Sequence, residues 1–120
     1  MTIVKSGDET KKVTVEKMEG AKNVQKELLI GPKENPPNFA MRRFTVGKDG
    51  QTPLHTHDWE HEVYILKGRG EVMTEDGPQK IEAGNTVYVS PGEKHQFKSD
   101  SGELVFLCLV PNRGEPSFEK

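Results

Sequence analysis

The sequence predicts an all-β protein whose single domain is folded as a β-sandwich or barrel. Short apolar runs recur from Gln25 onwards and are separated by glycine, proline and aspartate. Helical periodicity is nearly absent. Many short strands joined by tight turns are typical of these two architectures. The length of 120 residues fits one domain, and no repeat or linker divides the chain.

Strands are expected where apolar residues alternate or cluster between turn residues. The predicted strands are Glu27–Ile30, Phe39–Val46, Thr52–His57, Glu62–Leu66, Gly70–Thr74, Lys80–Glu82, Thr86–Ser90, His95–Lys98 and Leu104–Val110. The turns between them contain Gly31-Pro32, Asn35-Pro36-Pro37, Gly47-Lys48-Asp49-Gly50, Glu75-Asp76-Gly77-Pro78, Gly84-Asn85 and Pro91-Gly92. Asp76-Gly77, between two short strands, predicts a β-hairpin.

The ends of the chain look different from its centre. Residues 1–23 are polar and rich in lysine, and they predict a loose arm or an edge strand. Residues 24–113 contain the predicted barrel, and residues 114–120 are expected to form a C-terminal tail.

Composition limits the possible partners and the compartment. Only 32% of the residues are hydrophobic and 30% are charged, so the expected core is thin, and a homodimer or a bound metal would help to stabilise it. A net charge of −2, with lysine and glutamate spread along the chain, predicts no nucleic-acid partner. No apolar run reaches signal-peptide or membrane-spanning length, and the single cysteine, Cys108, excludes an internal disulfide. We therefore expect a cytoplasmic protein with no membrane partner.

The four histidines of the chain predict a single metal site. His55, His57 and His61 fall within seven residues. Side chains alternate along a strand, so His55 and His57 point the same way, and His61 keeps this parity if the corner before it does not shift the register. His95 comes from a later segment. Imidazole is the commonest metal ligand near neutral pH, so a convergence of these rings would form a ligand set.

The types of ligand narrow the chemistry of such a site. Structural zinc sites typically include cysteines, and a chain with one cysteine cannot form a thiolate-rich finger. Four neutral ligands leave the charge of a divalent ion uncompensated, which favours an additional anionic ligand such as a carboxylate substrate, hydroxide or reduced dioxygen. An octahedral ion would also keep two positions open. The ligand count therefore favours a reactive or ligand-binding centre.

Two stretches resemble the sequence motifs of the cupin superfamily. Gly50 to Gly68, which contains His55-Thr56-His57, resembles the first cupin motif, and Gly84 to His95 resembles the second. The segments 38–42 and 106–111 are similar to those of small single-domain cupins with four histidine ligands. The resemblance spans residues 25–111 and implies a cupin-type double-stranded β-helix, which is a jelly-roll barrel. The expected cofactor is one divalent transition-metal ion, with manganese or iron favoured and copper, zinc or nickel as alternatives.

The sequence departs from the cupin pattern at the ligand that follows His57. Most cupins carry a glutamate there, whereas this chain has His61, with Glu62 in the alternative glutamate position. Strand parity and the spacing of the four-histidine subgroup favour His61 as the ligand, with Glu62 as a hydrogen-bond acceptor that orients an imidazole. A bulge before His61 would reverse this choice. Two further departures, Ser90 and Ser99, concern only the shape of loops.

A substrate pocket is expected beside the metal. The resemblance places Phe106 and Cys108 near the ion, although core packing explains Phe106 equally well. Cys108 is expected to form a pocket wall and not to act as a nucleophile. Arg42 could hold a substrate carboxylate, and Phe97 should share the face of His95 because it follows that residue by two.

Many cupins are dioxygenases, so the resemblance implies a metal-dependent oxygenase-type enzyme that acts on a small organic substrate. The cupin fold also serves isomerases and decarboxylases, so the fold alone does not identify the reaction. A second class of function is a binding module without turnover, in which the metal positions a ligand or holds the strands together. Oxygen consumption with candidate substrates would distinguish the two classes.

Overall fold

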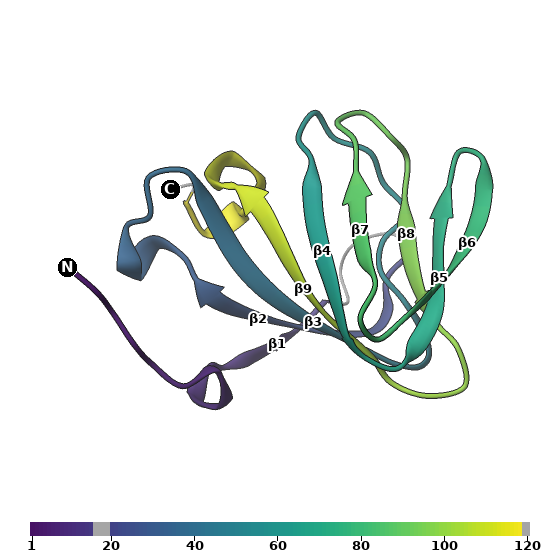
Figure 1. Ribbon diagram of the computed structural model, residues 1–120, viewed down its shortest axis with the longest axis horizontal. Coiled ribbons are helices and arrows are strands. Elements are labelled where there is room, and N and C mark those ends of the chain that lie inside the picture. The colour runs from purple at the N-terminus through teal and green to yellow at the C-terminus, as the bar shows by residue number, and fades with distance from the viewer. Residues whose placement is uncertain (16–19, 119–120) are drawn as a thin grey trace.

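The computed structural model describes residues 1–15 and 20–118 and consists mainly of antiparallel strands (Figure 1). Its strands are β1 (Lys12–Thr14), β2 (Lys22–Ile30), β3 (Phe39–Gln51), β4 (His61–Lys67), β5 (Arg69–Thr74), β6 (Gly77–Glu82), β7 (Thr86–Val89), β8 (Gln96–Ser99) and β9 (Leu104–Pro111). Short 3-10 turns lie at Gly7–Glu9, Pro32–Glu34, Asn112–Gly114 and Pro116–Phe118. The described residues contain no α-helix, so the predicted all-β class is confirmed.

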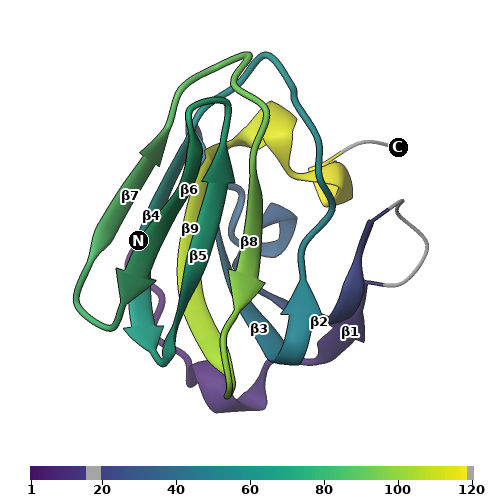
Figure 2. The ribbon, with the colours of Figure 1, turned by 90° about the vertical axis from the view of Figure 1, so that its right-hand side faces the viewer.

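The strands form one strongly curled sheet. Its order is β6-β5-β8-β3-β9-β4-β7, with β2 added on β3 and β1 on β2. All these pairings are antiparallel. Figure 2 shows the sheet curling so that β7 and β4 come to face β5 and β8 across the interior. The curl brings segments that are far apart in sequence to the same end of a half-barrel.

Most predicted strands are present, but β2 and β6 begin earlier than expected, at Lys22 and Gly77, and the largest difference lies around the first histidines. β3 continues through the expected turn at residues 47–50 and ends at Gln51, with Asp49 in the left-handed region (φ 58°). The strand predicted over Thr52–His57 does not form, and only an isolated bridge between His55 and His95 remains. Pro53 lies in this segment, and proline has no N–H to contribute to a ladder. The histidines therefore lie on a connecting loop.

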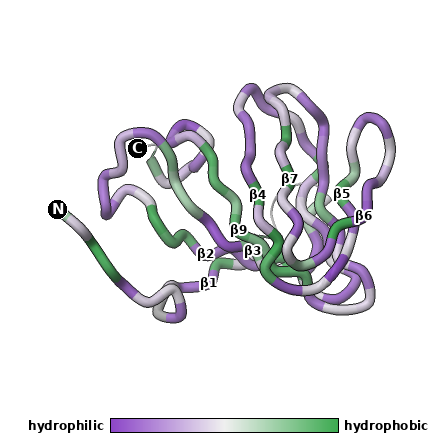
Figure 3. The backbone as a smooth tube through the Cα atoms, in the orientation of Figure 1, coloured by the Kyte–Doolittle hydropathy of each residue, from purple (hydrophilic) through white to green (hydrophobic). Residues whose placement is uncertain are grey.

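Regular alternation along β9 fills the core. Leu104, Phe106, Cys108 and Val110 are buried, while the residues between them are partly exposed. Figure 3 shows hydrophobic colour along most of β9. The Phe106 ring stacks on Phe97 of β8, with ring centroids 4.7 Å apart. β9 therefore provides the floor of the half-barrel between β3 and β4.

The two ends of the chain join the sheet more closely than their composition suggests. Within the expected N-terminal arm, β1 is an edge strand that pairs with β2. After β9, residues 112–118 form two 3-10 turns that place the side chain of Glu115 in the interior, where it is 1% exposed. Among the described residues, none of the helical turns has the length or the apolar character that crossing a bilayer requires.

Candidate metal centre

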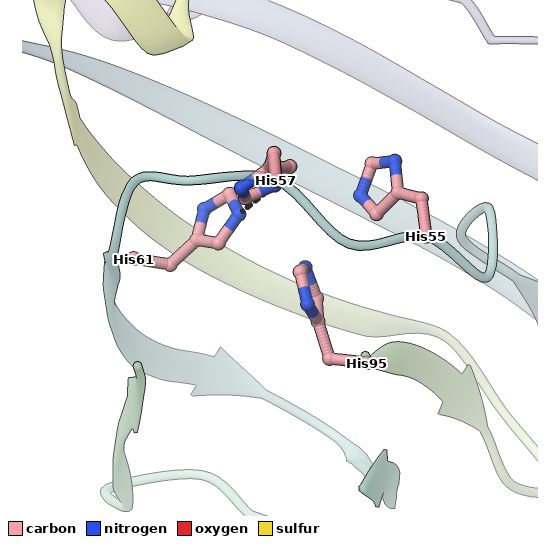
Figure 4. Close-up of side chains that lie close together, drawn as sticks. All are labelled: His55, His57, His61 and His95. Atoms are coloured by element: carbon pink, nitrogen blue, oxygen red, sulfur yellow. Dashed lines mark hydrogen bonds between the residues drawn. The ribbon is translucent and has the colours of Figure 1, made fainter. Parts of the chain in front are cut away.

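All four histidines meet at one end of the half-barrel (Figure 4). His55 and His57 lie on the loop between β3 and β4, and His61 is the first residue of β4. His95 directly precedes β8. Its backbone exchanges two hydrogen bonds with that of His55, with N to O distances of 3.1 and 3.3 Å. This isolated bridge fixes the distant histidine opposite the other three.

The rings are close enough to share one cation. Each residue offers a nitrogen, and these atoms all lie within 4.8 Å of one another. Nε2 of His57 and Nε2 of His61 are 2.8 Å apart. Two imidazoles bound at right angles to one ion, each at about 2.1 Å, would have nitrogens about 3 Å apart. The cluster therefore fits a single transition-metal ion.

Hydrogen bonds at the outer ring nitrogens orient the imidazoles. Nδ1 of His57 bonds the carbonyl oxygen of Trp59 at 3.1 Å, and Nδ1 of His95 bonds that of Glu93 at 2.9 Å. Carbonyl oxygens can only accept, so each Nδ1 carries the proton and each Nε2 keeps its lone pair. The His57 ring is also held by Trp59, which stacks on it at 4.1 Å with an interplanar angle of 6°. This tautomer is the one that a metal at Nε2 requires.

Electrostatics keep these rings neutral at physiological pH. Burial, followed by the neighbouring charge of His95, lowers the pKa of His55 to about 4 and that of His61 to about 2. Burial also lowers the pKa of His57 and of His95. A neutral imidazole presents a lone pair, so the cluster is prepared for a cation. Because the cluster contains only imidazoles, it brings no negative charge of its own to an ion.

Glu62 lies outside this cluster. β4 alternates with His61, Val63 and Ile65 buried and Glu62 exposed, so the register places His61 inward. The outer ring nitrogens of His57, His61 and His95 contact Trp59, Cys108 and Glu93, respectively, and not Glu62. No bulge intervenes between His61 and Val63, since both keep consecutive partners on β7.

The four residues expected to line a pocket are all buried, with exposures of 2–5%. Cys108 touches the cluster, because its Sγ lies 3.1 Å from Nδ1 of His61. Arg42 lies one step further out, with Nη2 3.3 Å from the same sulfur and Nη1 3.0 Å from a carboxylate oxygen of Glu115. Two of its guanidinium nitrogens are therefore engaged within the protein, and its expected role in holding a substrate carboxylate stays a prediction. Phe97 and Phe106 stack on each other within the core.

Glu115 is the buried residue near the centre that sequence reasoning missed. It follows the last strand in a short polar segment, and no periodicity marks it as buried. Arg42 could have indicated a residue such as Glu115, because an arginine buried in the core requires an anionic partner.

Comparison with known proteins agrees with the motifs. Residues 42–110, more than half of the chain, match the family model described as a cupin domain. A curated 1-methylthio-D-xylulose 5-phosphate methylsulfurylase from Rhodospirillum rubrum is 37% identical over 71 residues, which are 58% of this chain and 46% of that protein. The HTH-type transcriptional activator RhaR from Pectobacterium carotovorum is 36% identical over 62 residues, which are 51% of this chain and 22% of that protein. The chain thus spans less than half the length of these curated relatives.

Solved structures also resemble this chain over most of its length. The polyketide cyclase RemF from Streptomyces resistomycificus superposes with a TM-score of 0.86 at 28% identity, covering 93% of this chain and 80% of that chain. The agreement of fold and family model confirms the cupin-type double-stranded β-helix expected from the motifs. With its four imidazoles gathered where the two motifs meet, the chain belongs to the cupin family.

Proposed function

We propose that this chain is a metal-dependent enzyme that acts on a small anionic organic molecule. The single observation that supports this most strongly is the all-imidazole cluster, which is neutral and contains no carboxylate among its members. One divalent transition-metal ion, with manganese or iron favoured, would be held by His55, His57, His61 and His95.

The charges around the cluster favour an anionic ligand. On the far side of Cys108 from the cluster lies Arg42, which is cationic and buried. The intervening group, Cys108, is a thiol whose burial raises its pKa, so it adds no negative charge. A divalent ion in this setting keeps most of its charge, and a carboxylate, enolate or phenolate would compensate it.

We infer that the reaction uses the ion without oxidation of the substrate. A bound divalent ion supplies Lewis acidity, which stabilises negative charge that develops on a substrate oxygen. The protein would hold the ion with four neutral imidazoles and no carboxylate ligand to weaken this acidity. Cyclisation, isomerisation and decarboxylation are the reaction types that benefit. Support comes from the 28% identity to a polyketide cyclase over most of both chains.

An oxygenase-type reaction is the second candidate. The observation that favours it is the ligand count, because four imidazoles leave two positions of an octahedral ion for dioxygen and substrate. Such a reaction requires an ion that changes its oxidation state and consumes oxygen, whereas Lewis-acid catalysis requires neither.

A comparison of two metals separates these candidates. Metal-free protein is loaded with Zn²⁺, which has no redox chemistry, or with Fe²⁺, and is offered a panel of phenols and enolisable ketones with and without oxygen. Turnover by the Zn²⁺ protein under anaerobic conditions supports Lewis-acid catalysis. Turnover by the Fe²⁺ protein alone, with stoichiometric uptake of oxygen, supports the oxygenase. The same assay with the His95→Ala variant measures the background reaction that does not depend on the metal site.

A binding module without turnover is the third outcome of this experiment. It is favoured by the similarity to part of the transcriptional activator RhaR. Saturable binding of a panel compound to the metal-loaded protein, with the compound recovered unchanged, would identify this function and overturn the enzymatic proposal.

A further inference from the structure

The C-terminal segment Asn112–Phe118 contacts residues that hold two imidazoles of the metal centre, His57 and His61, in place. On one side, Arg113 pairs with Asp58 at 2.7 Å, and its guanidinium carbon lies 5.8 Å from the ring centre of Trp59. Trp59 is the residue that stacks on His57. Gly114 lies so close to Trp59 that an added Cβ would be 2.6 Å from Nε1 of the indole.

On the other side, Glu115 enters the interior and joins a cluster of buried charges. Its carboxylate lies 2.7 Å from Nζ of Lys26 and 3.0 Å from Nη1 of Arg42. The backbone N–H of Ser117 donates to the same carboxylate at 3.0 Å, and the Ser117 hydroxyl also bonds it. A carboxylate as deeply buried as that of Glu115 requires partners, because desolvation of an unpaired ion is strongly unfavourable.

From Glu115, an unbroken series of contacts reaches the metal centre. Arg42 turns Nη1 to Glu115 and Nη2 to the sulfur of Cys108. The same sulfur lies 3.1 Å from Nδ1 of His61, while Nε2 of that ring faces His57. A guanidinium is planar and rigid, so the position of Glu115 at one nitrogen sets the direction of the other.

We propose that Glu115 is a positioning residue for the metal centre and that docking of segment 112–118 is coupled to metal binding. Glu115 fixes Arg42, which fixes Cys108, which in turn holds the orientation of the His61 ring. Coupling between two sites is reciprocal, so metal binding must also stabilise the docked segment. This inference rests on the metal site of the proposed function and is independent of the reaction that occurs there.

Hydrogen exchange measured by mass spectrometry tests the coupling, with Co²⁺ alone as the probe. In the wild-type protein, Co²⁺ should slow exchange in the peptide that covers residues 112–118 by about fivefold or more. The peptide that covers the β5–β6 turn serves as the internal control and should change little. The effect should vanish in His95→Ala, in which a ligand is missing.

Two glutamate variants test the role of Glu115. Glu115→Gln should weaken Co²⁺ binding about tenfold and abolish the protection of residues 112–118. Glu103→Gln is the matched control, because Glu103 forms an exposed ion pair with Lys67 at 3.5 Å, and it should bind Co²⁺ as the wild type does. If Glu115→Gln does not fold, the double variant Arg42→Met/Glu115→Gln removes both buried charges and should fold with weakened Co²⁺ binding.

The results separate this inference from the metal site itself. A folded Glu115→Gln or double variant with wild-type Co²⁺ affinity would overturn the positioning role. Binding of Co²⁺ to the wild type without any change in the exchange of residues 112–118 would overturn the coupling. A wild-type protein that binds no Co²⁺ would overturn the metal site, and with it the proposed function.

Discussion

The sulfur of Cys108 lies 3.1 Å from Nδ1 of His61, in the position where many metalloproteins place a carboxylate or carbonyl against a histidine ligand. Burial raises the pKa of this thiol more than the nearby Arg42 lowers it, so the group stays neutral. A carboxylate at this position would make the imidazole a stronger donor and add negative charge. A thiol does neither, which preserves the electrophilic character of a bound ion.

Removal of this sulfur should weaken metal binding. In Cys108→Ala, Nδ1 of His61 and Nη2 of Arg42 both lose a partner, and we expect the affinity for Mn²⁺ or Co²⁺ to fall about tenfold in calorimetric titration. Cys108→Ser keeps an acceptor at nearly the same place and should retain most of the affinity. Equal affinities for Cys108→Ala and the wild type would show that the thiol is only core packing.

The ligand set can be tested by adjacent substitutions on β4. His61→Ala removes an inward imidazole and should reduce metal occupancy severely, as should His55→Ala and His95→Ala. Glu62→Gln changes an exposed side chain on the other face of the strand and should leave occupancy unchanged. Elemental analysis after metal loading and dialysis measures the metal occupancy of each variant. Loss of the metal from Glu62→Gln with retention in His61→Ala would reverse the assignment.

The sequence was most informative where spacing and chemistry agree. The three clustered histidines and His95 are a conspicuous set of one residue type, so the sequence alone predicts their convergence. Strand parity also placed His61 inward and Glu62 outward, because β4 begins at His61 and alternates regularly. The strands around them were found because glycine and proline mark their ends.

What the sequence concealed depends on tertiary contacts. The loop that carries His55 and His57 was predicted as a strand, since its pattern alternates although Pro53 prevents ladder pairing. Arg42 was expected to face a substrate, because its partner Glu115 lies 73 residues away in a segment that is polar throughout. The local pattern of polar and apolar residues does not reveal an ion pair between residues so far apart in the sequence.

Acid should destabilise the metal-free protein in two overlapping steps. The first comes from histidines. Burial, with the charge of His95, lowers the pKa of folded His55 from 6.5 to about 4, while the unfolded chain takes up its proton near 6.5. Acid therefore favours the unfolded state, and stability that is complete above pH 6.5 is lost as the pH falls towards about 4.

The second step comes from carboxylates. Burial alone would raise the pKa of Glu115, but hydrogen bonds from Lys26 and Ser117 outweigh it and lower the pKa from 4.5 to about 2. The stability that Glu115 contributes is present above pH 4.5 and is lost as the pH falls towards about 2. Urea denaturation across this range should show both steps, and His55→Asn should reduce the first without removing it, because His57, His61 and His95 also have lowered pKa values. A free energy of unfolding that stays constant from pH 6.5 to 4.5 would contradict the prediction.

Gly114 provides a test of the contact between the C-terminal segment and the indole of Trp59. A Cβ at this position would lie 2.6 to 2.9 Å from three atoms of that ring, so Gly114→Ala must displace either the ring or the segment. We expect a loss of about 1–3 kcal/mol in the free energy of unfolding, as for other overpacked sites. Since Trp59 stacks on His57, the affinity for Co²⁺ should fall as well. Gly102→Ala is the control, because nothing lies within 4 Å of its added Cβ, and it should change neither quantity. If Gly114→Ala lowers stability but leaves Co²⁺ affinity unchanged, the Trp59 stack does not support the His57 ligand.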